Sequence, residues 1–163
     1  MFQSHKDIKF FIFTFKIDYI QYKPKPQKMQ KIEHIGIAVK DLQASNSIFE
    51  KLFGAPAYKS EEVASEGVIT SFFKSGPNKI ELLEATNPES PIAKFIEKRG
   101  EGIHHIAFEV EDIHAEIARL QAEGFLVLNE IPKKGADNKL VAFLHPKSTN
   151  GVLIELCQEI KAI

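Results

Sequence analysis

The sequence predicts a protein of the α+β class, made of two similar modules in which a strand and a helix are followed by further strands. The main observation is an internal repeat, because residues 34–41 (HIGIAVKD) recur as residues 105–112 (HIAFEVED). A second match follows later in each half, where Ile-Glu-Leu stands at 80–82 and again at 154–156. Similar segments at matched places in two halves indicate a duplicated unit, which accounts for residues 31 to 158.

Each module is expected to contain one helix directly after its first strand. Asp41 and Asp112 follow the two repeated strands, and aspartate is a favourable N-cap residue. Gly54 and Gly124 stand at the opposite ends, where glycine commonly closes a helix. Apolar residues recur at helical spacing between these signals, namely Leu42, Phe49 and Leu52 in one module and Ile113, Ile117 and Leu120 in the other.

Further strands are expected later in both modules. In the first module, residues 68–73 and 79–84 are rich in strand-forming side chains and flank a turn at 75–78. The expected strands of the second module fall at 127–128 and 140–144, and a polar loop at 132–139 lies between them.

The domain is predicted to cover residues 29–160. Module one spans about 31–86 and module two about 102–158, and a linker helix at about 88–100 joins them. Ser90 caps this helix, Pro91 begins it and Gly100 ends it. Residues 1–28 contain five phenylalanines and end in alternating lysines and prolines, so we expect them to be a peripheral extension.

Composition and charge limit the classes of partner. Lysine and arginine number 21 against 22 aspartates and glutamates, so a basic surface for nucleic acid or an anionic membrane is not expected. No apolar run approaches the ~18 residues of a membrane-spanning helix. The single cysteine, Cys157, cannot form an internal disulfide, which suits a reducing compartment. We expect a cytoplasmic protein with a small-molecule partner, with the mitochondrial matrix left open for a eukaryotic source.

Four polar side chains are predicted to share the face of the sheet that points away from the module helices. Alternation along the strands places His34, Glu81, His105 and Glu155 there, with small residues beside both histidines. Two imidazoles and two carboxylates suit a divalent ion such as Co²⁺, Mn²⁺, Ni²⁺ or Zn²⁺, whose charge would balance the two carboxylates. The same alternation places His104 on the helix-facing side, where we expect a structural role.

Several segments resemble the methylmalonyl-CoA epimerases, a family of the vicinal oxygen chelate (glyoxalase/dioxygenase) superfamily. The resemblance covers roughly residues 29–158 and implies two βαβββ modules that form a U-shaped mixed sheet, usually in a homodimer. It also implies an acyl-CoA substrate and one divalent metal ion, held by His34, Glu81, His105 and Glu155. The segments that carry the resemblance are 34–39 (HIGIAV), 79–83 (KIELL), 90–96 (SPIAKFI), 102–110 (GIHHIAFEV) and 145–156 (HPKSTNGVLIEL).

The reaction implied by the resemblance is metal-dependent epimerisation of methylmalonyl-CoA at C2, a 2R to 2S interconversion through a metal-stabilised enolate, as in propionate metabolism. Glu155 matches the glutamate that the family uses as an acid/base group. Thr70 stands where some members carry a second glutamate, so the second base is sought in Glu66 or in a water held by Thr70. Thr70 and Lys147 are the candidate substrate-binding residues, and Lys147 and the loop at 133–139 are candidates for binding the CoA portion.

Two other functions remain open at this point. A glyoxalase I-type lactoylglutathione lyase uses the same set of histidines and glutamates on the same fold, so fold and metal do not separate it from an epimerase. A non-catalytic binding member of the superfamily is the other alternative, although such a protein does not need all four ligands.

Overall fold

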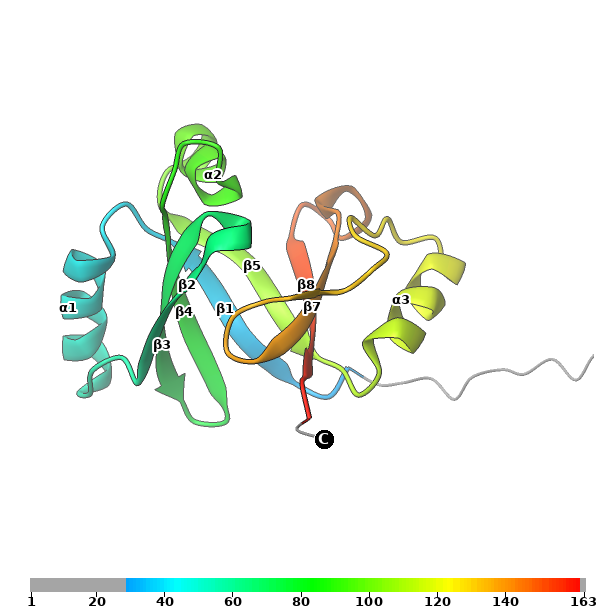
Figure 1. Cartoon of the computed structure of the whole chain (residues 1–163), viewed down its shortest axis with the longest axis horizontal. Helices are drawn as coiled ribbons and strands as arrows, with labels where there is room; N and C mark the ends of the chain where they lie inside the picture. Colours follow the sequence, from blue (N-terminus) through cyan, green and yellow to red (C-terminus); the bar gives the residue numbers. More distant parts are fainter. Residues whose placement is uncertain (1–28, 162–163) are drawn as a thin grey trace, which may run out of the picture.

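The structure is a computed structural model that describes residues 29–161, and within these residues eight strands form one curled, mixed sheet. The expected α+β fold with two βαβββ modules and a U-shaped sheet is confirmed (Figure 1). The predicted extension at 1–28 lies outside the described residues, and the domain boundaries stay a prediction.

The strands are β1 (Ile32–Ala38), β2 (Lys59–Val63), β3 (Val68–Ser75), β4 (Asn78–Ala85), β5 (Gly102–Glu109), β6 (Lys133–Lys134), β7 (Lys139–Leu144) and β8 (Leu153–Glu159). The helices are α1 (Leu42–Phe53), α2 (Pro91–Arg99) and α3 (Ile113–Ala122), with short 3-10 turns η1 (Ala64–Glu66) and η2 (Pro146–Ser148).

The order of the strands reflects the duplication. It runs β2-β3-β4-β1-β5-β8-β7-β6, so the first strands of the two modules meet at the centre. Each first strand lies parallel to the last strand of its own module, whereas β1 and β5 pair antiparallel with each other. The short polar strands β2 and β6 therefore form the two ends of the sheet.

Two register shifts interrupt the pairing of β1 with β5. His34 pairs with Ala107 and Ile32 with Phe108, which leaves Glu33 as an extra residue. The second shift makes His104 the extra residue, because it lies between two paired residues of β5. A β-bulge of this kind changes the direction of the side chains around it. Each bulge directly precedes one of the two predicted ligand histidines.

The predicted caps of the helices are confirmed. The Asp41 carboxylate accepts a hydrogen bond from the Ala44 backbone amide, and Gly54 ends α1 in the left-handed conformation with φ of 70°. Asp112 caps α3 by accepting from two backbone amides in the same way. Ser90 caps α2, and the Pro91 ring begins it. None of the helices within residues 29–161 is long and apolar enough to cross a membrane.

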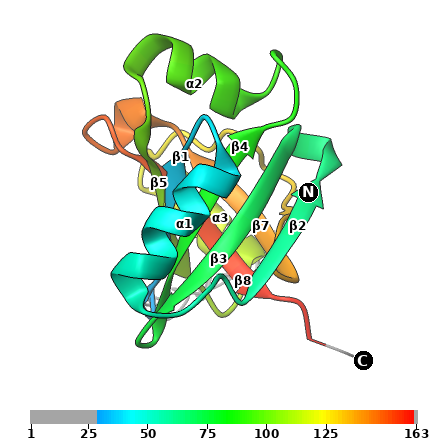
Figure 2. The same cartoon turned by 90° about the vertical axis from the view of Figure 1, so that its left-hand side faces the viewer.

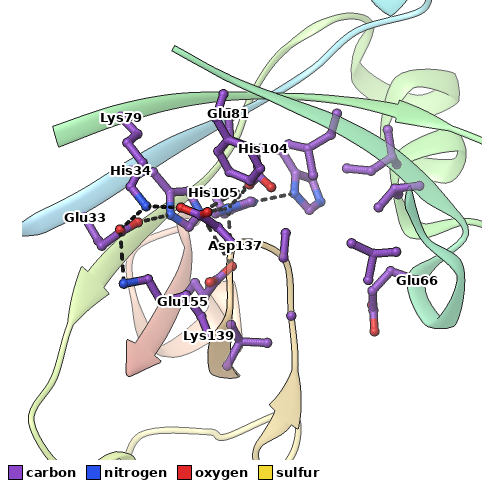
Figure 3. A pocket seen from close by; sticks show the side chains of 18 of the residues that line it. Glu33, His34, Glu66, Lys79, Glu81, His104, His105, Asp137, Lys139 and Glu155 are labelled. Carbon is purple, nitrogen blue, oxygen red and sulfur yellow. Dashed lines mark hydrogen bonds and ion pairs between the residues drawn. The ribbon is translucent and has the colours of Figure 1, made fainter. Parts of the chain in front are cut away.

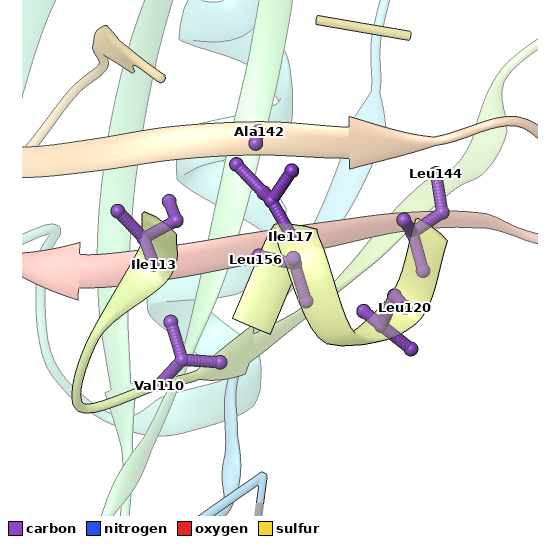
Figure 4. Close-up of a cluster of buried hydrophobic side chains, with 7 residues drawn as sticks. All are labelled: Val110, Ile113, Ile117, Leu120, Ala142, Leu144 and Leu156. Carbon is purple, nitrogen blue, oxygen red and sulfur yellow. The ribbon is translucent and has the colours of Figure 1, made fainter. Parts of the chain in front are cut away.

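The helices of the modules cover the outer face of the curled sheet (Figures 1 and 2). Ile113, Ile117 and Leu120 of α3 pack against β7 and β8 in one buried cluster (Figure 4). In the other module Leu42 of α1 packs with Phe73 and Leu82, and α2 covers Ala38 and Leu83 near the end of β1. The concave inner face is consequently left open, and both polar and apolar side chains line the pocket there.

Two details of the second module differ from expectation. Residues 127–128 form a single bridge, between Val127 and Leu144, instead of a strand. The predicted loop at 132–139 contains the two-residue strand β6, which pairs with the start of β7. Strand β2, with the sequence KSEEV, was not predicted either. Strands this short and polar lack the alternation of apolar residues from which a strand is recognised.

Truncation of Leu120 tests the packing of α3. The Leu120→Ala variant should lose about 2–5 kcal/mol of unfolding free energy, because it leaves a cavity in a buried cluster. Leu52→Ala in α1 is the matched control, since the Leu52 side chain is 70% exposed and its loss should cost less than about 1 kcal/mol. Urea unfolding followed by circular dichroism measures both. Equal losses would contradict the described packing.

Candidate active site

The four side chains predicted as ligands converge on the concave face. His34 Nε2 lies 2.9 Å from His105 Nε2 and 3.2 Å from Glu81 Oε2, and His105 Nε2 lies 3.3 Å from Glu155 Oε2. The remaining separations between histidine and glutamate atoms are 3.5 and 3.9 Å. Donor atoms that each lie about 2.0–2.2 Å from one ion are separated by distances of this size. All four side chains are buried.

Strand register explains the convergence. Gly36 of β1 pairs with Glu81 of β4 on one side and with His105 of β5 on the other. Ala107 of β5 likewise lies between His34 and Glu155. Each small residue therefore has a histidine and a glutamate as its cross-strand neighbours, which brings both modules to a common point. A Cβ added at Gly36 would lie 2.2 Å from the His105 ring, so only glycine leaves room for this imidazole.

Glu33 determines which nitrogen of His34 faces the other ligands. The Glu33 side chain is buried, and its Oε2 accepts a hydrogen bond of 2.6 Å from His34 Nδ1. When the ring is neutral with its proton on Nδ1, as a metal ligand must be, the Nε2 lone pair is directed at His105 and the glutamates. Hydrogen bonds from His34 and Lys79 outweigh burial and lower the pKa of Glu33 to about 2.

His104 lies on the inner face, so its prediction as a helix-facing residue is wrong. The bulge in β5 breaks the alternation on which that prediction rested. His104 Nδ1 lies 3.0 Å from His105 Nδ1, and its ring meets Phe95 of α2 edge-on. Burial and the neighbouring His105 lower the pKa of His104 to about 4, so this imidazole is neutral at pH 7. It holds His105 as Glu33 holds His34 (Figure 3).

The two glutamates differ in how firmly they are held. Glu81 Oε1 accepts a 2.9 Å hydrogen bond from the Thr70 hydroxyl, which is fully buried. Thr70 therefore orients Glu81 and does not line the pocket. Within residues 29–161 no comparable hydroxyl or amide bonds Glu155, which leaves this carboxylate freer to move.

Burial and charge set the protonation of the cluster. Burial raises the pKa of Glu155. For Glu81 burial acts in the same direction, but the two histidines outweigh it and lower the pKa. Burial opposes a charge on His34, yet Glu155 and Glu81 raise its pKa to about 10. The two buried carboxylates thus need a compensating positive charge. Either a proton on His34 or a metal ion can supply this charge, so protonation of His34 competes with metal binding.

A single pocket surrounds this cluster and extends beyond it (Figure 3). Its polar wall contains Lys79 and Lys139, which both pair with Glu33, and Asp137, which pairs with Lys79. Glu66 of η1 also lines the pocket and pairs with Lys133. Lys147 lies exposed in η2 and is not among the lining residues, whereas Gly135, Ala136 and Lys139 of the loop at 133–139 are.

The sequence patterns single out neither Glu33 nor Lys79, they include Asp137 only as part of the loop at 133–139, and they place His104 on the wrong face. The available signal was the position of Glu33 and His104, since each is a polar residue directly before a repeated His-Ile pair. Lys79 and Asp137 lie 58 positions apart, and nothing local in the sequence connects them.

A family model confirms the resemblance seen in the sequence. Residues 33–143 match the model of the Glyoxalase/Bleomycin resistance protein/Dioxygenase superfamily. The matched range includes the bulge at Glu33 and three of the four converging side chains.

Characterised relatives narrow the family further. The ethylmalonyl-CoA/methylmalonyl-CoA epimerase of Cereibacter sphaeroides is 44% identical over 130 residues, covering 78% of this chain and 97% of the relative. The mitochondrial methylmalonyl-CoA epimerase of Dictyostelium discoideum is 43% identical over 127 residues, covering 77% and 76%.

Solved structures agree with these relatives. A variant of the Streptomyces coelicolor methylmalonyl-CoA epimerase, in complex with 2-nitronate-propionyl-CoA, superimposes with a TM-score of 0.78 at 35% identity and covers 81% of this chain and 96% of its own. The Mycobacterium tuberculosis enzyme gives a TM-score of 0.80 at 30% identity, with 86% and 95% covered. The duplicated fold, the family model and the identity to these proteins together place the chain in the methylmalonyl-CoA epimerase family of isomerases, within the glyoxalase/bleomycin resistance protein/dioxygenase superfamily.

Proposed function

We propose that this protein interconverts the 2R and 2S epimers of methylmalonyl-CoA, using one divalent metal ion held by His34, Glu81, His105 and Glu155. The observation that carries the proposal is the convergence of these four buried side chains. The two Nε2 atoms lie 2.9 Å apart, and each lies 3.2 to 3.9 Å from the Oε2 atoms of the two glutamates. The names of the relatives, and a neighbouring structure in complex with methylmalonyl-CoA, support the substrate.

The residues present fit a divalent cation. Glu33 fixes the proton of His34 on Nδ1, so the Nε2 lone pair faces the cluster. If His105 likewise carries its proton on Nδ1 and donates it to His104, its Nε2 is also a donor atom for the metal. Imidazole and carboxylate ligands suit Co²⁺, Mn²⁺, Ni²⁺ or Zn²⁺. The ion would act as a Lewis acid that withdraws charge from the thioester oxygen of the substrate.

Epimerisation requires a proton to leave one face of C2 and to return on the other. Glu155 is suited to one face, because its carboxylate is buried at the cluster and lacks the hydroxyl partner that fixes Glu81. For the opposite face we assign Glu66, a carboxylate that lines the same pocket from η1. Thr70 supports the site indirectly, by holding Glu81.

With this function we also propose where the substrate binds, where in the cell the protein acts and how it assembles. The acyl-CoA enters the pocket bounded by the loop at 133–139, and the reaction belongs to propionate metabolism in the cytoplasm. We also propose a homodimer, which the family resemblance implies.

Removal of the metal is the first test. Protein treated with a chelator should lose C2 proton exchange on methylmalonyl-CoA in D₂O, and Co²⁺ should restore it, because the proposed ion supplies the charge that stabilises the enolate. Mass spectrometry of the thioester measures the exchange, and elemental analysis measures the metal content per chain. Turnover of methylglyoxal with glutathione, without exchange on methylmalonyl-CoA, would establish the glyoxalase I alternative and overturn the proposal.

Variants of the two glutamates test the division of labour between faces. Glu155→Gln and Glu66→Gln should each slow epimerisation by about 10²- to 10⁴-fold, the usual contribution of a general acid/base group. Each variant should still exchange the C2 proton of one epimer, and the two should retain opposite epimers. Starting from resolved 2R and 2S thioesters, deuterium uptake measures this selectivity. Loss of exchange from both epimers in Glu66→Gln, or no loss of epimerisation, would remove Glu66 from the mechanism.

Substitution of Gly36 tests the arrangement around His105. In Gly36→Ala the new Cβ would overlap the His105 ring, so metal affinity should fall by about 10- to 100-fold. Gly54→Ala is the control, because it strains a left-handed position with φ of 70° but meets nothing within 4 Å and lies at the C-terminal end of α1. It should lower the melting temperature and leave metal affinity unchanged. Titration with Co²⁺ measures affinity, and unchanged binding by Gly36→Ala would contradict the described packing.

A further inference from the structure

Polar contacts join the two ends of the eight-stranded sheet. Strands β2 and β6 stand at opposite ends of the strand order and do not pair with each other. The loop between β6 and β7 nevertheless reaches β2, where the Asp137 backbone amide donates a 2.9 Å hydrogen bond to Glu61. The Asp137 carboxylate accepts from Tyr58 at 3.1 Å and pairs with Lys59 at 3.2 Å. Module two is thereby tied to module one across the concave face.

Asp137 and Asn138 are the two central residues of the turn between β6 and β7, where the Lys139 backbone amide donates to the Ala136 carbonyl at 3.2 Å. The φ of Asp137 is 52° and that of Asn138 is 59°, both in the left-handed region that side chains other than glycine adopt infrequently. A tight hairpin turn requires this conformation at both central residues, and aspartate and asparagine adopt it more readily than most side chains do. The contacts of Asp137 are with residues 58, 59, 61 and 79, all of them in the other module.

From Asp137 a continuous set of contacts leads to the cluster (Figure 3). Asp137 Oδ2 lies 2.6 Å from Lys79 Nζ, which also pairs with Glu33 Oε1. The other oxygen of Glu33 accepts the proton of His34 Nδ1 at 2.6 Å. The exposed fraction of the side chain falls along this path, from 22% at Asp137 to 17% at Lys79 and 3% at Glu33. The path therefore begins at the pocket wall and ends at a buried imidazole.

We propose that Asp137 is a positioning residue for the metal site: it anchors the pocket-lining β6–β7 loop to Lys79, and through Lys79 and Glu33 it sets the orientation of His34. The inference rests on the proposed metal role of His34. Asp137 touches none of the four converging side chains, so its effect on them passes through Glu33.

The charges along the path explain why the anchor matters. Lys79 lies between two carboxylates, and its ammonium group is held in place by both. Without the Asp137 charge, Lys79 and Lys59 lose a shared partner and the loop loses its contact with β4. Lys139, which lies 3.5 Å from Glu33, then competes with a mobile Lys79 for the same oxygen. Glu33 is less well fixed, and so is the ring that it orients.

A double-mutant cycle on metal affinity tests the proposal. Asp137→Asn keeps the shape of the side chain and removes its charge, and it should weaken Co²⁺ binding by about two- to thirtyfold, as coupled networks do. Glu33→Ala should weaken binding by about 10- to 100-fold. In the Glu33→Ala background Asp137→Asn should have no further effect, because the path is already cut. Competition with a chromophoric chelator gives the affinities, and the visible absorption band of bound Co²⁺ reports the ligand geometry.

Arg119→Gln is the matched control, because it removes a paired charge from α3, away from the pocket. It should lower the melting temperature without changing Co²⁺ affinity or the absorption band. An unchanged affinity in Asp137→Asn, or the same fractional loss with and without Glu33, would overturn the inference while leaving the proposed epimerase intact. Wild-type protein that binds no divalent cation would overturn both.

Discussion

The antiparallel pairing of β1 with β5 is the contact on which the site depends. It joins the two modules at the centre of the sheet and places Gly36 and Ala107, the small residues of the two copies, each between a histidine and a glutamate. Neither module alone contains the full set, because each supplies one imidazole and one carboxylate. Duplication of a βαβββ unit thus produces a four-ligand site from two pairs.

Two bulges in the same pairing supply the side chains that contact the ligand histidines. The bulges at Glu33 and His104 turn one further polar side chain inward beside each histidine. These partners differ in charge, since Glu33 is a carboxylate within a network of lysines and His104 is a neutral imidazole packed on Phe95. Buried carboxylates require compensating positive charge, and the lysines supply it around Glu33 as a cation would at the cluster.

The sequence predicts the parts of this arrangement that depend on local patterns, and it does not predict those that depend on contacts between distant residues. His34, Glu81, His105 and Glu155 are predictable because each recurs in a repeated motif and strand alternation is a local rule. The caps at Asp41, Ser90 and Asp112 are predictable because an N-cap also depends on local sequence, namely the capping residue and the helix directly after it. Glu33 and His104 are not, because a bulge reverses the alternation and depends on the partner strand. The roles of Thr70 and Asp137 depend on cross-strand and inter-module contacts, which no local pattern specifies.

The most direct test of the central claim is anomalous scattering from a crystal of the Co²⁺-loaded protein. We expect one peak per chain, about 2.0–2.2 Å from Nε2 of His34, Nε2 of His105 and a carboxylate oxygen of each of Glu81 and Glu155. A peak within bonding distance of residues from only one module would contradict the proposed site. So would the absence of a peak at the cluster in crystals of fully Co²⁺-loaded protein.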